Sequence, residues 1–530
     1  MFDLIIRKPL IVDGTGEARY QADVGIENGV ITKIGEIPQE AQSKNTINAK
    51  GCLLIPGFVD AHSHFETAIF DSEFKYGRIM QGITSDIVGN CGPTPAPYNP
   101  EQENVLKNMY YSLTGTGLTY DWNWKTMGEY LDALERTGSP SNIASLIGHG
   151  TLRTLVMGHE NRPATQRELD KMKGILAESL EEGAIGLGLG LSYIPGMACT
   201  KKELVELANV CREHRAIIAA HRRDEGHMAV EAVDEMLDIA TETGVKMQIS
   251  HLKVTGKKNW GKSHQLFQHI ENARAKGADV MFDVYPYVTG YIKLCYVFPS
   301  WVLTGSEANM LERLEAPALV QKIVEEMNTP EKMLFSLYTN ATAEGIVIVA
   351  CEEKQYLHMT LAEIARKRNE DPIHCAINLV RRNHNQIMMI CYMQNEKELE
   401  SIIAHPLSMI CSDGAPAINH SQHPRYKGAF VRVLDHYVKE KKLLTLEEAV
   451  KKMTSLTAKR FSLKKRGEIK EGYKADLLVL DFENLRDNAT YENPDEKADG
   501  IVYTIVNGQI VAKSGKSLDI CAGSILRHSR

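Results

Sequence analysis

Two histidines separated by one residue, His62 and His64, are the first residues in the chain whose types and spacing suit metal chemistry. They end the stretch that starts at Pro56, after an apolar run from Cys52 to Ile55. In an extended backbone, side chains two residues apart point to the same side, so both imidazoles can reach one ion. A surface or capping pair explains a lone His-x-His as well. The metal interpretation therefore depends on ligand-type residues further along the chain.

The elements that would position such residues are strands alternating with helices. Apolar runs rich in β-branched residues predict eight strands, at residues 52–60, 83–90, 143–148, 184–191, 216–221, 246–251, 279–285 and 407–413. Helical periodicity appears between several of them, at residues 165–181, 201–214 and 228–243. Eight such units predict an α/β fold of the TIM-type (β/α)8 barrel class, in which chemistry takes place at the C-terminal ends of the strands.

Six ligand-type residues recur at the ends of five predicted strand segments or directly after them. They are His62, His64, Cys91, His221, His251 and Asp413. One histidine at the end of an apolar strand is usually structural, but this many ligand types at converging strand ends are hard to obtain by accident. The sequence therefore predicts a metal site at the C-terminal face of the barrel.

Both chain termini differ from the central part in pattern. Asn28-Gly29 and Asn507-Gly508 each stand between short alternating apolar segments, a strong hairpin signal. We expect a small β-sandwich built from residues 1–52 and 466–530, flanking a barrel at 53–465. A long interval at residues 288–406 separates strands seven and eight and contains a helical run at 360–369. It is predicted to be an insertion that acts as a lid or shapes the substrate pocket, a solvated elaboration being the alternative.

The composition restricts the class of protein. The net charge of -7 and the pI of about 6.2 argue against a nucleic-acid partner. No signal-peptide core and no membrane-length apolar run occurs, so we expect a cytoplasmic protein without a membrane partner. The ten cysteines contain no Cys-x-x-Cys pair, which is typical of reduced thiols. The oligomeric state stays open.

The motifs then indicate a family. The stretch from Pro56 to His64 and the late Ser412-Asp413-Gly414 resemble the amidohydrolase superfamily of metal-dependent hydrolases. Cysteine at position 91, in place of the carboxylated lysine of many relatives, is similar to the N-acyl-D-amino-acid deacylases (D-aminoacylases). The other motifs that match are Ser192 to Gly196, His221 to Glu225, Ser250 to Lys253, Tyr285-Pro286-Tyr287 and His423-Pro424-Arg425. Residues 288–293 depart from the family pattern, because they are bulkier than the small, hydroxyl-rich continuation expected there.

The resemblance implies a zinc centre with one tight site and a second, weaker one. The resemblance implies that Cys91, His221 and His251 form the tight site and that His62, His64 and Asp413 surround the weaker one. The sequence supports this only in that thiolate and imidazole ligands suit Zn²⁺. Asp413 is the expected general base, taking a proton from the attacking water and delivering it to the leaving amine. A purely structural or ligating Asp413 is the alternative.

The predicted substrate is a small molecule, an N-acyl-D-amino acid, and its free carboxylate requires a cation. Lys253 is the first candidate, Tyr193 and Tyr287 are expected at the substrate, and Arg425 offers a bidentate alternative. Three residues are expected to support the site from behind, namely Arg223, Glu225 and His149, the last with a structural role as an equal alternative.

Three functions are compared. The leading one is zinc-dependent deacylation of N-acyl-D-amino acids. The second is opening of a cyclic amide by an enzyme of the hydantoinase or dihydropyrimidinase type, and the cysteine together with Ser250 to Lys253 favours the first. The third is a scaffold that has lost its chemistry, which predicts missing ligands, whereas all six are present.

Overall fold

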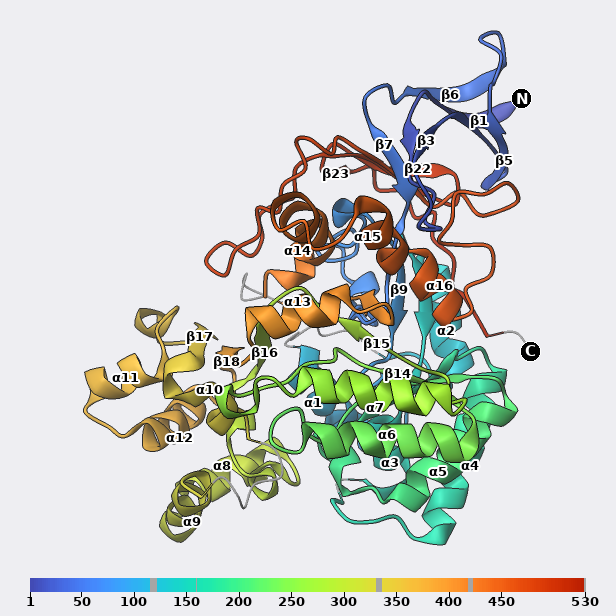
Figure 1. The fold of residues 1–530 in the computed structure, drawn as a ribbon. Helices are drawn as coiled ribbons and strands as arrows, with labels where there is room; N and C mark the ends of the chain where they lie inside the picture. The colour runs from blue at the N-terminus through green and yellow to red at the C-terminus, as the bar shows by residue number, and fades with distance from the viewer. Residues whose placement is uncertain (115–121, 159, 330–335, 418–422, 529–530) are drawn as a thin grey trace.

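The computed structural model describes residues 1–114, 122–158, 160–329, 336–417 and 423–528, and has an α/β fold (Figure 1). Its central strands all run parallel: β8-β9-β10 form one group, and β11-β12-β13-β14-β15-β19 the other. Leu146, between β10 and β11, donates to Val88 O (2.9 Å) and so continues the pairing with β9. The strands are β8 (Phe58–Asp60), β9 (Ile83–Val88), β10 (Asn142–Ser145), β11 (Ile147–Gly148), β12 (Gly186–Gly190), β13 (Ile217–His221), β14 (Lys246–Ile249), β15 (Val280–Val284) and β19 (Ser408–Ile410). All eight predicted strand regions contain strands, with β10 and β11 together filling the third.

The first and last of these strands meet at their carboxyl ends. Ser63 and Gly414 form a parallel bridge. On either side of it, Asp413 N donates to His62 O (2.8 Å) and His64 N donates to Gly414 O (3.0 Å). Residues 350 positions apart in sequence are thereby fixed side by side.

Helices follow the strands, and Figure 1 shows α4 to α7 stacked along one side of the molecule. The three predicted helices are confirmed as α4, α5 and α6. Thr165 forms a capping box with Glu168 before α4, and the Thr200 hydroxyl accepts from Glu203 N before α5. Apart from α8 to α12, the helices are α1 (Glu103–Thr114), α2 (Met127–Thr137), α3 (His149–Met157), α4 (Gln166–Glu181), α5 (Lys201–Glu213), α6 (Ala229–Thr243), α7 (Ser263–Ala275), α13 (Glu396–Ala404), α14 (Arg425–Arg432), α15 (Leu446–Met453) and α16 (Ser455–Arg460).

The predicted strand at 52–60 is divided at Gly57. Its first part, β7 (Leu53–Pro56), pairs with β20 (Leu477–Leu480) in a terminal sheet, while β8 joins the central strands. A Cβ on Gly57 would lie 2.2 Å from the side chain of Thr84, so only glycine lets the chain pass there. One apolar run therefore serves two sheets.

Two sheets lie at the end of the molecule that holds the N-terminus (Figure 1). The first has the order β5-β4-β1-β6, and the second, β23-β22-β21-β20-β7-β2-β3, combines strands from both ends of the chain. They share an apolar core that includes Leu4, Ile26, Leu54, Leu477 and Ile505. Asn28, Gly29, Asn507 and Gly508 all have positive φ, which confirms both hairpin turns. The strands are β1 (Phe2–Arg7), β2 (Leu10–Ile11), β3 (Tyr20–Gln21), β4 (Asp23–Glu27), β5 (Val30–Gly35), β6 (Ser43–Asn48), β21 (Ile501–Val506), β22 (Gln509–Lys513) and β23 (Lys516–Ser517).

Between β15 and β19 lies a separate group of elements with its own apolar core, seen at the left of Figure 1. An antiparallel sheet of order β16-β18-β17 is combined with helices α8 to α12. The predicted helix at 360–369 is confirmed as α11, but the sheet was not predicted. The elements are β16 (Thr289–Lys293), α8 (Glu307–Glu315), α9 (Pro317–Met327), α10 (Leu337–Gly345), β17 (Ile346–Ala350), α11 (Leu361–Arg368), α12 (Pro372–Arg382) and β18 (Met388–Tyr392). Among the described residues, no helix combines the length and apolar character needed to cross a membrane.

Candidate metal centre

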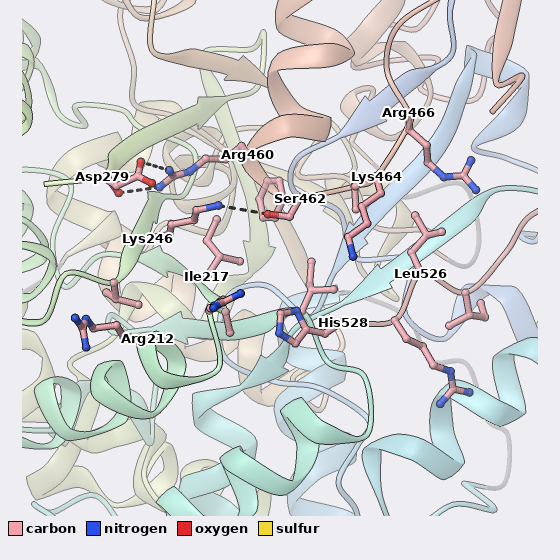
Figure 2. Close-up of a pocket in the computed structure, with 18 of the residues that line it drawn as sticks. Arg212, Ile217, Lys246, Asp279, Arg460, Ser462, Lys464, Arg466, Leu526 and His528 are labelled. Carbon is pink, nitrogen blue, oxygen red and sulfur yellow. Dashed lines mark hydrogen bonds and ion pairs between the residues drawn. The ribbon is translucent and has the colours of Figure 1, made fainter. Parts of the chain in front are cut away.

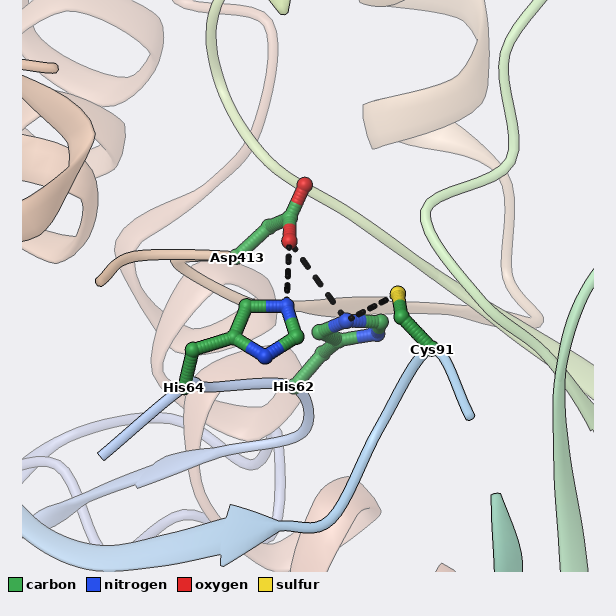
Figure 3. Close-up of side chains that lie close together, drawn as sticks. All are labelled: His62, His64, Cys91 and Asp413. Atoms are coloured by element: carbon green, nitrogen blue, oxygen red, sulfur yellow. Dashed lines mark hydrogen bonds and ion pairs between the residues drawn. The ribbon is translucent and has the colours of Figure 1, made fainter. Parts of the chain in front are cut away.

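All six ligand-type residues predicted from the sequence lie together at the carboxyl ends of the central strands. Two groups have donor atoms within 4.8 Å of one another: His62, His64, Cys91 and Asp413, drawn in Figure 3, and Cys91, His221 and His251. Cys91 belongs to both groups. The arrangement follows from the parallel strands, whose carboxyl ends place these residues on one face.

The spacing of the donor atoms suits a tetrahedral ion. Cys91 Sγ lies 3.4 Å from His62 Nε2, 3.6 Å from His221 Nδ1 and 3.7 Å from His251 Nε2. Asp413 Oδ1 lies 3.4 Å from His62 Nε2 and 3.3 Å from His64 Nε2. Two ligand atoms on one tetrahedral Zn²⁺ stand about 3.3 to 3.6 Å apart, the longer value being for a sulfur and a nitrogen at usual bond lengths. The donor set therefore fits zinc in spacing as well as in type.

Burial affects the protonation states of these donors. It keeps His62 and His221 neutral, as ligation requires, and it favours the protonated thiol at Cys91. Burial lowers the pKa of His62 and of His221 well below the usual value, so their imidazoles stay neutral. Burial, and then the Asp413 carboxylate, raise the pKa of the Cys91 thiol well above its usual value. A thiolate at Cys91 therefore needs a positive ion beside it.

Asp413 is ionised although it is buried. Burial raises its pKa, but the Arg425 guanidinium and a hydrogen bond with His64 outweigh that effect and hold the pKa well below the usual value. Arg425 Nη1 donates to Asp413 Oδ2 at 2.7 Å. One carboxylate oxygen thus faces the histidines and the other is held by the arginine.

Three of the ligand-type residues have a backbone conformation that is unusual for residues other than glycine. Cys91, His251 and Asp413 have φ of 58°, 34° and 47°. Each such residue costs about 1–3 kcal/mol, and the surrounding structure has to hold it in place. Strain concentrated on donors from three different strand ends is typical of a functional site.

A cavity opens beside these donors and contains several of the predicted substrate residues. Tyr193, Lys253 and Arg425 line it, as does Glu225. The Tyr193 ring centroid lies 4.6 Å from that of His221. Lys253 Nζ lies 3.0 Å from Glu225 Oε1 and donates to His251 O at 3.1 Å.

Tyr287 differs from the expectation, because it is absent from the described lining. Tyr287 N donates to Tyr285 O (2.9 Å) in a tight turn around Pro286. The Tyr287 ring consequently packs on His423 and Arg432, and Tyr285 lines the cavity instead.

Arg223 and His149 lie behind the cavity wall. Arg223 pairs with Glu235 (2.8 Å) and donates to Met197 O and Cys199 O (2.8 Å each), which fastens the loop before α5. His149 Nε2 lies 2.7 Å from Glu203 Oε1. Although His149, Cys199 and Glu203 are close enough to hold an ion, both Glu203 oxygens already accept from Arg153 (2.7 and 2.6 Å), so this group is an ion-pair cluster.

The sequence predicted that the insertion acts as a lid or shapes the pocket, but it did not name the lining residues that come from the insertion, which are Tyr291, Ile292, Leu337, Cys391 and Met393. The bulky run at 288–293 was the one available signal for it. Leu337, Cys391 and Met393 gave none, because nothing in their local sequence links them to the strand ends.

A larger hollow lies at the opposite, N-terminal ends of the strands (Figure 2). Its labelled residues are mostly basic, and its acidic residue Asp279 is paired with Arg460. In the described part of the chain, none of the clustered metal donors lies there. The two donor groups that share Cys91 lie instead at the smaller cavity.

Comparison with known proteins gives a consistent result over the whole chain. The model of the Amidohydrolase family matches residues 45–209 and 341–512. D-aminoacylase of Alcaligenes xylosoxydans xylosoxydans is 32% identical over 529 residues, covering 99% of this chain and 97% of that protein. N-acyl-D-glutamate deacylase of the same organism is 34% identical, covering 96% of this chain and 93% of that protein.

Solved structures agree with these relatives. The N-acyl-D-glutamate deacylase of Bordetella bronchiseptica, complexed with zinc and a phosphonate mimic of the tetrahedral intermediate, has a TM-score of 0.83 at 31% identity and covers 99% of each chain. A D-hydantoinase from Thermus sp. has a TM-score of 0.56 at 15% identity, covering 99% of each chain, which is a likeness of fold alone.

Proposed function

This chain belongs to the amidohydrolase family and, within it, to the N-acyl-D-amino-acid deacylases; on that premise we propose that it hydrolyses the amide bond of N-acyl-D-amino acids. The products are a carboxylate and a free D-amino acid. The observation that carries the proposal is Cys91, whose Sγ lies 3.4 to 3.7 Å from three histidine nitrogens at the carboxyl ends of parallel strands. The cyclic-amide alternative has only a distant fold likeness in its support.

The residues that would hold the metal are those of the two donor groups. Cys91, His221 and His251 form the tight zinc site, and His62, His64 and Asp413 surround a second, weaker one. Thiolate and neutral imidazole are donors that Zn²⁺ prefers. When bound, the ion supplies Lewis acidity that polarises an amide carbonyl and activates water at neutral pH.

Asp413 is the general base in this proposal. Its carboxylate takes a proton from the attacking water and delivers that proton to the leaving amine. Support comes from its position beside the donors, from its ionised state and from Arg425, which fixes the orientation of the carboxylate by a hydrogen bond of 2.7 Å. That contact makes Arg425 an orienting residue for Asp413.

Lys253 is the cation for the α-carboxylate of the substrate. Its ammonium group is 5.3 Å from the Tyr285 ring centroid and 3.0 Å from Glu225 Oε1, so it is held at the cavity wall. Tyr193, over His221, adds a hydroxyl donor. Glu225 also lies 3.2 Å from His251 Nδ1 and thereby positions a metal ligand and the substrate cation together.

For the architecture we propose that the parallel strands form a TIM-type barrel within residues 53–465, with 288–406 as its insertion. The bridge between Ser63 and Gly414 supports closure of that barrel. Residues 1–52 and 466–530 form the β-sandwich, supported by the core that the two terminal sheets share.

A side-by-side assay tests the function. Purified protein with its zinc content measured is given N-acetyl-D-methionine, N-acetyl-L-methionine and hydantoin. We expect hydrolysis of the D-amide and little of the other two. Faster turnover of hydantoin would favour the cyclic-amide alternative, and no turnover of any of them by zinc-loaded protein would reject both.

A further inference from the structure

One wall of the cavity is built by the insertion and is apolar except for Tyr291, which also lines the cavity. Ile292 from β16, Leu337 from α10, Cys391 from β18 and Met393 just after β18 line the cavity. All four belong to the same buried apolar cluster, and Cys91 is a member of it as well. The core of the insertion therefore extends directly up to the metal centre.

The register of the insertion sheet decides which side chains form this wall. Gly290 on β16 lies opposite Cys391 on β18, and Ile292 lies opposite Met389. A Cβ on Gly290 would stand 2.6 Å from Met393 Cε, so glycine at this position leaves the space that the methionine fills. Met393 is thus seated against the strand beside the cavity.

The basic residue on the same strand is turned away from the substrate. Lys293 follows Ile292, but its Nζ lies 3.6 Å from Glu307 Oε2 on α8, and it is absent from the described lining. Among the described residues, the insertion supplies no cation to the cavity.

The cations that do line the cavity already face carboxylates of the protein. Lys253 is paired with Glu225, and Arg425 with Asp413. Lys253 is assigned to the α-carboxylate of the substrate. A second carboxylate, on the substrate's side chain, would meet either the apolar wall or an arginine that already holds Asp413.

We propose that this enzyme prefers N-acyl-D-amino acids with apolar side chains, such as those of D-methionine and D-leucine, to N-acyl-D-glutamate and N-acyl-D-aspartate. The wall of Ile292, Leu337, Cys391 and Met393 produces this preference. The inference rests on the proposed deacylase function and narrows its substrate class. Sequence identity does not make this choice, because relatives acting on different D-amino acids are about equally similar.

The first test is kinetic. The value of kcat/KM is measured for the N-acetyl derivatives of D-methionine, D-leucine, D-glutamate and D-aspartate with zinc-loaded protein. We expect the first two to exceed the last two by at least about 100-fold, because a buried carboxylate without a partner is strongly disfavoured. Equal or higher values for the acidic substrates would overturn the proposal.

A binding measurement separates this proposal from the deacylase function. N-acetyl-D-methionine and N-acetyl-D-glutamate are titrated calorimetrically into the zinc-loaded Asp413→Asn variant. Tighter binding of the methionine derivative, by about tenfold or more, supports the apolar wall even where turnover is absent. Equal or tighter binding of the glutamate derivative overturns the wall, whatever the turnover.

Substitutions in the wall give the second test. Met393→Lys places a cation in it and should shift the ratio of kcat/KM from D-methionine toward D-glutamate by at least about tenfold. Tyr392→Lys is the matched control, because Tyr392 is the preceding residue and is 42% exposed, and it should leave the ratio unchanged. Leu337→Ala adds no charge and should lower kcat/KM for D-methionine alone. Thermal melts verify that each variant is folded, and an unchanged substrate ratio in folded Met393→Lys and Leu337→Ala would contradict the role of the wall.

Discussion

Replacing Lys253 by methionine tests how the substrate is held. The residue is 4% exposed and its ammonium group faces Glu225, His251 and the Tyr285 ring. A hydrogen bond between charged groups contributes about 1.5–3 kcal/mol, so losing the one to the α-carboxylate should lower kcat/KM by roughly 10- to 150-fold. The same change removes the nearer of the two cations of buried Glu225 and leaves Arg222 at 3.6 Å, so it should cost up to about 3–5 kcal/mol of stability.

The assay has to separate these two effects. Wild type and Lys253→Met are each given N-acetyl-D-methionine and its amide, N-acetyl-D-methioninamide, which has no α-carboxylate. In such a double-mutant cycle, damage to the site affects both substrates and cancels, whereas loss of the carboxylate contact affects only the acid. We expect the preference of the wild type for the acid to disappear in the variant. Lys258→Met, an exposed lysine nearby, is the control. If the acid and the amide lost activity by the same factor, Lys253 would be a structural residue and the carboxylate assignment would be refuted.

Three further results are expected. Asp413→Asn should lower kcat by about 10²- to 10⁴-fold with zinc retained, and near-wild-type turnover would exclude the general base. Arg78 is fully buried between Asp60 and Asp86 (2.9 Å to the latter), so Arg78→Met should cost about 3–5 kcal/mol in urea unfolding, and unchanged stability would show that the two carboxylates do not need it. Burial lowers the pKa of Lys452 to about 8. Between about pH 8 and pH 10.4 the unfolded chain binds more protons than the folded chain, so the free energy of unfolding should rise with pH by up to about 3 kcal/mol. The same rise in a Lys452→Met variant would contradict this linkage.

The sequence was sufficient for the elements whose signals are local. Strands such as β13 and β14 are short apolar runs that end in His221 or shortly before His251, and helices α4 and α5 have N-caps at Thr165 and Thr200. Because parallel strands place their carboxyl ends on one face, listing the strand ends was enough to gather the donors.

Features that depend on long-range pairing were not visible. β16 pairs with β18, whose residues lie about a hundred positions later, and neither run shows which of its faces meets the cavity. The division of one apolar run at Gly57 depends on how close Thr84 approaches, and the position of Tyr287 depends on the turn at Pro286. In each case the deciding contact comes from a different part of the chain or from backbone geometry.

Metal content of a Cys91 variant tests the central claim, that one cysteine connects both donor groups of a zinc centre. Zinc per chain is measured by mass spectrometry after dialysis for wild type, Cys91→Ser and Cys211→Ser, the last a fully buried cysteine of α5 outside both groups. We expect wild type and Cys211→Ser to retain at least one zinc and to hydrolyse N-acetyl-D-methionine, while Cys91→Ser remains folded but loses both. A Cys91→Ser protein with zinc content and activity equal to wild type would contradict the account.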